Sequence, residues 1–188
     1  QVVVNENASC GRNVFPLVTS NMETTVCYDV NDYLVVKKAA ELFVSDIENV
    51  TGQKMELTNE CKQGRSVVIV GTIEKNQVIR QLASKGKINI SPLEGAWERY
   101  LIQTVDRPFP GVNKALVVAG SDRRGAAYGL FSLSEIAGVS PWYWWADVPV
   151  KKHKTLYVDA PVTLSKTPSV KYRGIFLNDE DWGLKPWA

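Results

Sequence analysis

A run of four β-branched residues, Val67, Val68, Ile69 and Val70, most strongly limits what this chain can form. Successive side chains of a strand point to opposite faces of its sheet, so this strand has no polar face to turn toward water. Such continuous apolar strands are typical of sheets that are buried on both faces. The run therefore predicts a sheet covered on both sides.

Helical segments that could cover the sheet lie on either side of this strand. Residues 32–50 place apolar side chains three and four positions apart, which predicts an amphipathic helix. Asn31 or Asp32 is expected to be its N-cap, and Gly52 its C-terminal stop. Residues 74–84 are expected to form a second, shorter helix.

A third helix is expected over residues 121–137, capped by Ser121 and ended by Gly138. Gly125 and Gly129 lie four residues apart, so they fall on the same side of this helix. Because glycine has no side chain, we expect that side to approach the sheet closely.

Short β-branched and aromatic segments supply the remaining strands. Residues 14–18 and 25–28 are separated by a turn region and are expected to form a hairpin. Further strands are expected at residues 54–57, 97–105, 115–119 and 155–158. The chain is thus predicted to be α/β (α+β-like), with a mixed β-sheet covered by about three helices. Its 188 residues fit one domain of typical size plus an appendage.

Charge and apolar patterning exclude two classes of partner. The net charge of +2 comes from 22 basic and 20 acidic residues, without the basic stripe that nucleic-acid binding requires. No apolar run approaches the roughly 20 residues that cross a bilayer. We therefore expect no nucleic-acid partner and no membrane span.

Three cysteines, Cys10, Cys27 and Cys61, show neither metal-ligand spacing nor a CxxC motif. We expect no metal and no cofactor. One pair could form a disulfide in an oxidising compartment, and three buried thiols are the alternative. The chain begins without Met or a hydrophobic leader, which is consistent with a removed signal peptide and a secreted, periplasmic or cell-surface protein. A sequence that simply starts at this point explains the same observation.

Four consecutive aromatic residues, Trp142, Tyr143, Trp144 and Trp145, could stack against sugar rings. Four in a row cannot all face one way on a regular element, so at least half must pack against protein. We expect Trp142, Trp144 and Trp145 to face a neighbouring domain, with sugar stacking as the alternative.

The C-terminal end carries the one group of residues suited to glycosidic chemistry. A predicted strand at residues 171–177 leads into Asn178, Asp179, Glu180, Asp181 and Trp182. Glycosidic bonds are cleaved between two carboxyl groups, and aromatic faces receive sugar rings. A solvated acidic loop or a helix cap is the alternative interpretation.

Three stretches of the C-terminal half, GSDRRGAAYG (residues 120–129), SPWYWWADVP (140–149) and YRGIFLNDEDWG (172–183), closely resemble glycoside hydrolase family 115. The resemblance implies an α-glucuronidase that removes glucuronic acid, or its 4-O-methyl ether, from xylan with inversion. It also implies an N-terminal α/β domain like those that precede the TIM barrel of exo-acting glycosidases.

On this resemblance, residues 1–165 are expected to be the N-terminal accessory domain, and residues 166–188 a linker and the first strand of a truncated catalytic TIM barrel. The partners would then be the missing barrel of the same polypeptide and a glucuronoxylan-like polysaccharide. No complete catalytic site is expected, because the general acid of the family should lie further along the barrel. The chain alone is therefore expected to be inactive.

Active sites of TIM barrels lie at the C-terminal ends of the strands, and the acidic residues follow the C-terminal end of the strand predicted at residues 171–177. We expect Asp179 to orient or bind the sugar and Trp182 to form a wall of the pocket. Asn178, Glu180 and Asp181 are further candidates for substrate binding.

Two other functions compete with this interpretation. One is an independent carbohydrate-binding module that uses the aromatic residues from Trp142 to Trp145. The other is a nucleotide-binding α/β protein, suggested by Gly71 and Thr72 after a buried strand, although neither GxGxxG nor the Walker spacing is present.

Overall fold

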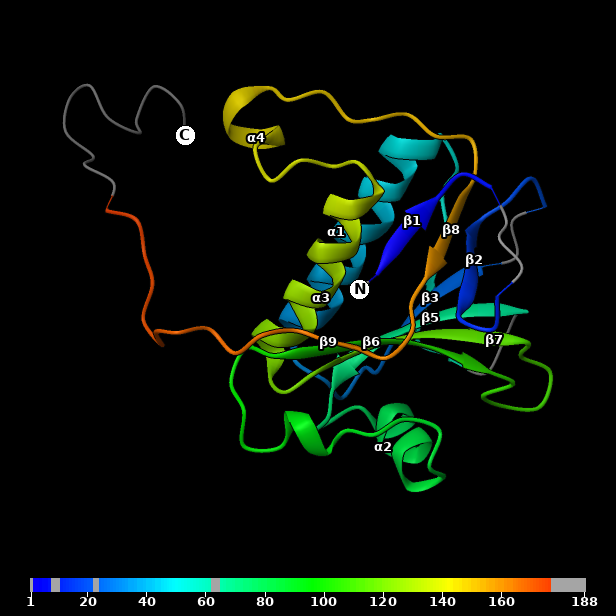
Figure 1. Cartoon of the computed structure of the whole chain (residues 1–188), viewed down its shortest axis with the longest axis vertical. Coiled ribbons are helices and arrows are strands. Elements are labelled where there is room, and N and C mark those ends of the chain that lie inside the picture. Colours follow the sequence, from blue (N-terminus) through cyan, green and yellow to red (C-terminus); the bar gives the residue numbers. More distant parts are fainter. Residues whose placement is uncertain (1, 8–10, 22–23, 62–64, 177–188) are drawn as a thin grey trace.

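The computed structural model describes residues 2–7, 11–21, 24–61 and 65–176, which form two sheets and their covering helices (Figure 1). The strands are β1 (Val3–Asn5), β2 (Val14–Val18), β3 (Thr24–Tyr28), β4 (Glu56–Thr58), β5 (Ser66–Thr72), β6 (Tyr100–Asp106), β7 (Lys114–Gly120), β8 (Leu156–Asp159) and β9 (Thr163–Leu164). The helices are α1 (Leu34–Thr51), α2 (Gln77–Ser84), α3 (Arg123–Ala137) and α4 (Tyr143–Ala146), with a 3-10 turn, η1 (Ser91–Leu93).

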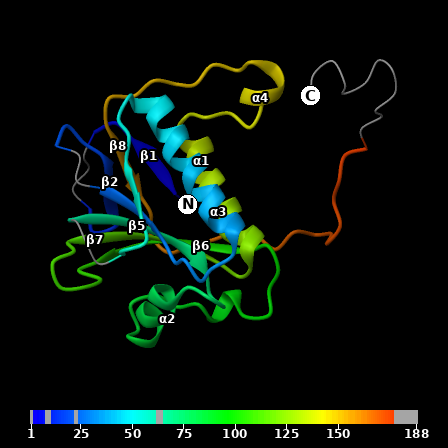
Figure 2. The same cartoon turned by 180° about the vertical axis from the view of Figure 1, so that it is seen from behind.

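The larger sheet has the strand order β4-β3-β5-β7-β6-β9. β5 lies near its centre, pairs in parallel with β3 and β7, and is buried along all seven residues. Val68 and Val70 join the apolar core that contains α1 and α3, whereas Val67 and Ile69 join the core that contains α2. Helices thus cover both faces (Figures 1 and 2), which confirms the prediction from the β5 sequence.

The smaller sheet pairs β8 in antiparallel fashion with β1 on one side and β2 on the other. The predicted hairpin between residues 14–18 and 25–28 is therefore wrong. β2 pairs with β8, which comes more than a hundred residues later in the sequence, while β3 enters the larger sheet in parallel with β4 and β5. Both segments are strands, but neither is the other's partner.

Helix caps differ from the sequence prediction by one residue. Asp122, not Ser121, is the N-cap of α3, and its carboxylate accepts from the amides of Arg124 at 3.0 Å and Gly125 at 2.8 Å. The Ser121 hydroxyl instead accepts from the amide of Arg99 at 3.0 Å. The stops at Gly52 and Gly138 are confirmed, because both adopt the left-handed conformation that glycine tolerates.

The start of α1 also departs from the prediction. Tyr33 is its N-cap and makes no side-chain capping bond. The Asp32 carboxylate turns toward the end of β5, where it accepts from the Thr72 amide at 2.7 Å and the Thr72 hydroxyl at 2.9 Å. Asp32 therefore joins the α1 start to the sheet instead of capping the helix.

The two glycines of α3 do permit a close approach to the sheet. A Cβ atom on Gly125 would lie 2.1 Å from the backbone oxygen of Arg99, and one on Gly129 would lie 2.5 Å from a methyl carbon of Val118. Both distances are shorter than a carbon atom tolerates. The prediction from their four-residue spacing is confirmed.

Beyond β9 the chain leaves the domain as an extended segment, residues 165–176 (Figure 1). Residues 171–176 form no strand within the described part of the chain, although the sequence predicts one at residues 171–177. A barrel strand forms its hydrogen bonds with neighbouring strands, and no strand of the described residues pairs with this segment. That the segment opens a barrel stays a prediction.

Candidate functional site

The residues predicted to contact substrate at the C-terminal end lie outside the described residues. They are Asn178, Asp179, Glu180, Asp181 and Trp182. Their roles stay predictions.

The aromatic run at residues 142–145 forms the start of α4, a helix that the sequence did not predict. The Trp142 side chain is 63% exposed, whereas Tyr143 is half-buried and packs against the core shared with α1 and α3. These two neighbouring residues thus have different surroundings, and that at least half of the run packs against protein stays a prediction. The side chains of Trp144 and Trp145 lie outside what the structure describes.

A groove of about 590 Å³ lies beside this run, between α1, α3 and the start of α4. Aromatic side chains supply one part of its lining, among them Tyr128, Phe131 and Tyr143. Asp46 and Glu135 contribute carboxylates. Burial raises the pKa of the Asp46 carboxyl, and the nearby Ser134 hydroxyl offsets part of that rise. Aromatic faces next to carboxylates could accept the apolar face and the hydroxyls of a neutral sugar.

A second polar group joins the first turn of α3 to the extended C-terminal segment. Glu98 is only 6% exposed, and its carboxylate forms ion pairs with Arg124, at 3.0 Å, and with Arg173. The Arg124 guanidinium also donates to the Tyr128 hydroxyl at 3.0 Å. Nothing in the sequence distinguishes Glu98 from the other glutamates, so sequence reasoning missed it. The salt bridge of Arg124 offsets its unfavourable position in the first turn of a helix.

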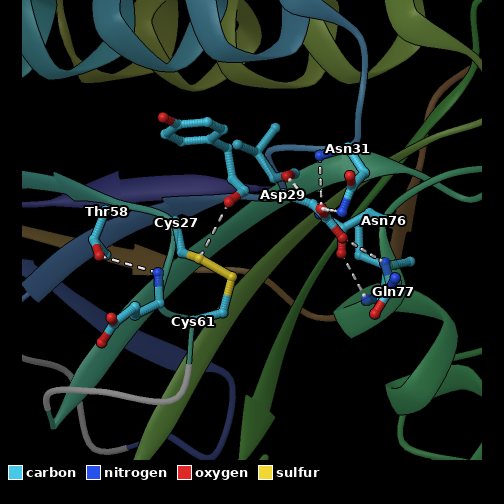
Figure 3. The surroundings of a disulfide bond; sticks show 11 residues. Cys27, Asp29, Asn31, Thr58, Cys61, Asn76 and Gln77 are labelled. Carbon is cyan, nitrogen blue, oxygen red and sulfur yellow. Dashed lines mark hydrogen bonds between the residues drawn. A yellow bond between two sulfur atoms is a disulfide. The ribbon is translucent and has the colours of Figure 1, made fainter.

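The carboxyl ends of the parallel strands meet at one edge of the larger sheet, where α/β proteins commonly bind ligands. Here the polar side chains bind backbone amides and one another. Asp29 accepts from the amides of Asn31 and Gln77, both at 2.9 Å (Figure 3), and the Tyr33 hydroxyl donates to Glu74 at 2.9 Å. The hydrogen bond to Glu74 raises the pKa of the Tyr33 phenol.

The glycine at this edge has a packing role. A Cβ atom on Gly71 would lie 2.3 Å from the side-chain nitrogen of Asn76, which caps α2 and donates to the backbone oxygen of Val70 at 3.0 Å. Gly71 makes room for this amide, which is reason enough for a glycine here without a phosphate ligand.

Cys27 and Cys61 form a disulfide that ties β3 to the loop after β4 (Figure 3). Their Cα atoms are 5.2 Å apart and both side chains are buried. The sequence left this pairing open. Cys10 lies outside the described residues.

Two classes of feature are absent from the described residues. No group of three or more His, Cys, Asp or Glu side chains is placed to hold a metal ion. Among the helices of the described part, none has the length and apolar character to cross a bilayer.

Comparison with known proteins identifies relatives of the chain. The family model described as Glycosyl hydrolase family 115 matches residues 165–188, and comparison with curated proteins gives no match. A solved structure described as a novel family GH115 4-O-methyl-α-glucuronidase, BtGH115A, with specificity for decorated arabinogalactans superposes with a TM-score of 0.70 at 33% identity. A structure of CpGH84D superposes with a TM-score of only 0.47 at 16% identity, over 84% of this chain and 22% of that chain, which is too weak to support an argument.

The alignment with BtGH115A covers 93% of this chain but 21% of that chain. The structural alignment therefore spans nearly the whole of this chain, and the family model separately matches its C-terminal residues. On these two findings, the chain belongs to glycosyl hydrolase family 115.

Proposed function

We propose that this chain is the non-catalytic N-terminal domain of an α-glucuronidase, and that it supports a catalytic barrel formed by further polypeptide. The observation that carries the proposal is the unequal coverage, because nearly all of this chain aligns with about a fifth of a family member. The two buried faces of the larger sheet support a scaffolding role. The Asp29 and Asp32 carboxylates at its carboxyl edge accept hydrogen bonds from the backbone amides of Asn31, Thr72 and Gln77, so they hold the loops of the domain together.

We also propose that the complete enzyme removes glucuronic acid, or its 4-O-methyl ether, from a plant polysaccharide. The resemblance of the sequence implies xylan as the carrier, and the description of BtGH115A names decorated arabinogalactans. Both polysaccharides therefore belong in the assay. Cleavage with inversion needs one carboxyl to protonate the leaving oxygen and a second to activate water.

Secretion, or placement in the periplasm or at the cell surface, is part of the same proposal. The Cys27–Cys61 disulfide supports it, because disulfides persist in oxidising compartments and are rare in the cytosol. A polysaccharide substrate would be met outside the cell.

The proposal is tested by measuring release of glucuronic acid from glucuronoxylan, arabinogalactan and aldouronic acids. The 188-residue chain should release none, because the two carboxyl groups that inversion requires are not both expected in it. In the complete enzyme, Asp179→Asn should lower turnover by orders of magnitude while the melting temperature stays unchanged. Product release by the 188-residue chain would contradict the assignment of a non-catalytic role, and near-normal turnover of the variant would contradict the role of Asp179.

An independent carbohydrate-binding module is the second candidate. The exposure of Trp142 and the aromatic groove beside it favour this function. Titration of the chain with xylan and arabinogalactan oligosaccharides, together with light scattering, separates the two. A clean monomer that binds oligosaccharide and loses binding on Trp142→Ala or Phe131→Ala indicates a module. A chain that self-associates through this surface without binding glycan indicates a face normally covered by protein.

A further inference from the structure

The extended C-terminal segment is attached to the domain at two points. The first is Ser165, whose amide donates to the Tyr100 oxygen at 2.9 Å and whose hydroxyl accepts from the Tyr100 amide at 2.9 Å. The second is Arg173, eight residues further on, which pairs with Glu98. Between them, residues 166–172 make no hydrogen bond or ion pair to the described residues that precede Ser165, and the Val170 oxygen accepts only from Arg173 of the same segment. The position of residue 173 therefore depends on the second attachment.

Glu98 is held in place without help from Arg173. Its backbone φ of 55° lies in the left-handed region, which is strained for a glutamate. Its amide donates to a carboxylate oxygen of Asp122 at 2.7 Å, and Asp122 is itself fixed as the N-cap of α3. The domain thus presents the Glu98 carboxylate at a defined position beside the first turn of α3.

The surroundings of Glu98 leave one oxygen for a second cation. Arg124 pairs with Oε1 at 3.0 Å, while Arg173 pairs with Oε2. A carboxylate that is only 6% exposed is destabilised unless its charge is paired, and the Arg124 side chain is itself 53% exposed. The Trp97 ring adds a face for the Arg173 guanidinium, with 6.0 Å from the guanidinium carbon to the ring centre.

We propose that Glu98 is a receptor for the Arg173 guanidinium, and that this ion pair fixes the direction in which the polypeptide leaves the accessory domain. The pairing requires no other part of an enzyme. Its consequence, a defined placement of the barrel against this domain, rests on the proposed function. Glu98 is thus a positioning residue.

The test is the backbone order parameter of residues 171–174, measured by ¹⁵N relaxation of the 188-residue chain. The parent should give values near those of the rigid domain, about 0.8, and Arg173→Gln and Glu98→Gln should each lower them below about 0.6. The double variant should show no further decrease, because both substitutions remove the same contact. Glu94→Gln, which neutralises an exposed glutamate four residues earlier, is the control and should match the parent.

Arg173→Gln keeps the test decisive if Glu98→Gln fails to fold. Its melting temperature should stay within about 2 °C of the parent, because Arg124 still pairs with the Glu98 carboxylate and the Arg173 side chain is itself 37% exposed. Order parameters of residues 171–174 that are equal in the parent and in Arg173→Gln, or that are already below about 0.6 in the parent, would overturn the proposal. Neither result bears on glucuronidase activity, so failure here is distinct from failure of the proposed function.

Discussion

Gly125→Ala tests whether α3 is held by backbone contact against Arg99, the residue that precedes β6. The added Cβ would lie 2.1 Å from the backbone oxygen of Arg99 and 3.0 Å from its carbonyl carbon. Because a backbone atom cannot rotate away, the helix or the strand must shift by about 1 Å to restore an ordinary contact. Replacing a helical glycine with alanine would by itself stabilise the protein by up to about 1 kcal/mol.

The steric cost should exceed that gain. Overpacking in a closely packed interior costs about 1 to 3 kcal/mol, and more where the backbone has to move. We expect a net loss of about 2 to 3 kcal/mol in the free energy of unfolding, which for a chain of this size lowers the melting temperature by roughly 4 to 12 °C.

The assay is thermal and urea unfolding followed by circular dichroism. Gly129→Ala is an informative comparison in the same helix, because its nearest neighbour at 2.5 Å is a side-chain methyl group of Val118, which can adjust. It should destabilise less than Gly125→Ala. Gly174→Ala, where no atom lies within 4 Å, should change nothing. A Gly125→Ala protein as stable as the parent, or more stable, would refute the argument that backbone contact requires this glycine.

Three further predictions concern other parts of the fold. Paired Cys27→Ala and Cys61→Ala substitutions should lower stability by about 3 to 4 kcal/mol, because the disulfide closes a loop of 34 residues, and reducing agent should lower the melting temperature of the parent but not of this variant. Asp122→Ala should cost about 2 kcal/mol in a urea titration, since the α3 cap and the Glu98 amide both lose their acceptor, whereas Glu135→Ala, at an exposed position of the same helix, should be nearly neutral. Burial raises the pKa of the Asp46 carboxyl, so the contribution of this residue to stability is present at low pH and is lost as the pH rises through its folded-state pKa. Asp46→Asn should therefore raise the melting temperature at pH 7 but not at pH 3. An equal change at both pH values would contradict this.

The sequence predicted the parts of the fold that depend on local patterns. The apolar run of β5 indicated two covered faces, and the glycine spacing in α3 indicated a close approach, because each feature is a direct consequence of strand or helix periodicity. Strand pairing is different. The composition of β2 shows that it is a strand but not that its partner is β8, because the backbone of many other strands could form the same hydrogen bonds with it.

The candidate site could be predicted only in part. The rule that four consecutive aromatics cannot share one face predicts different surroundings within the run but does not say that Trp142 is the exposed residue. The disulfide could not be assigned, because three cysteines allow three pairings and spacing does not choose among them. The role of Glu98 could not be predicted from the sequence, because it depends on the burial of its carboxylate and on ion pairs with Arg124 and Arg173, which are distant in the sequence.

The first turn of α3 is where these separate features meet. Gly125 sets the distance between α3 and the backbone of Arg99, Asp122 caps the helix and holds the Glu98 amide, and Glu98 binds Arg173. The residues that stabilise the helix start are therefore the same residues that position the outgoing chain. A substitution that displaces this turn, as Gly125→Ala would, should lower both the stability of the domain and the backbone order parameters of residues 171–174. A substitution that removes Arg173 should lower only those order parameters. Comparing both quantities across these variants separates the packing role of this turn from its role in holding the C-terminal segment.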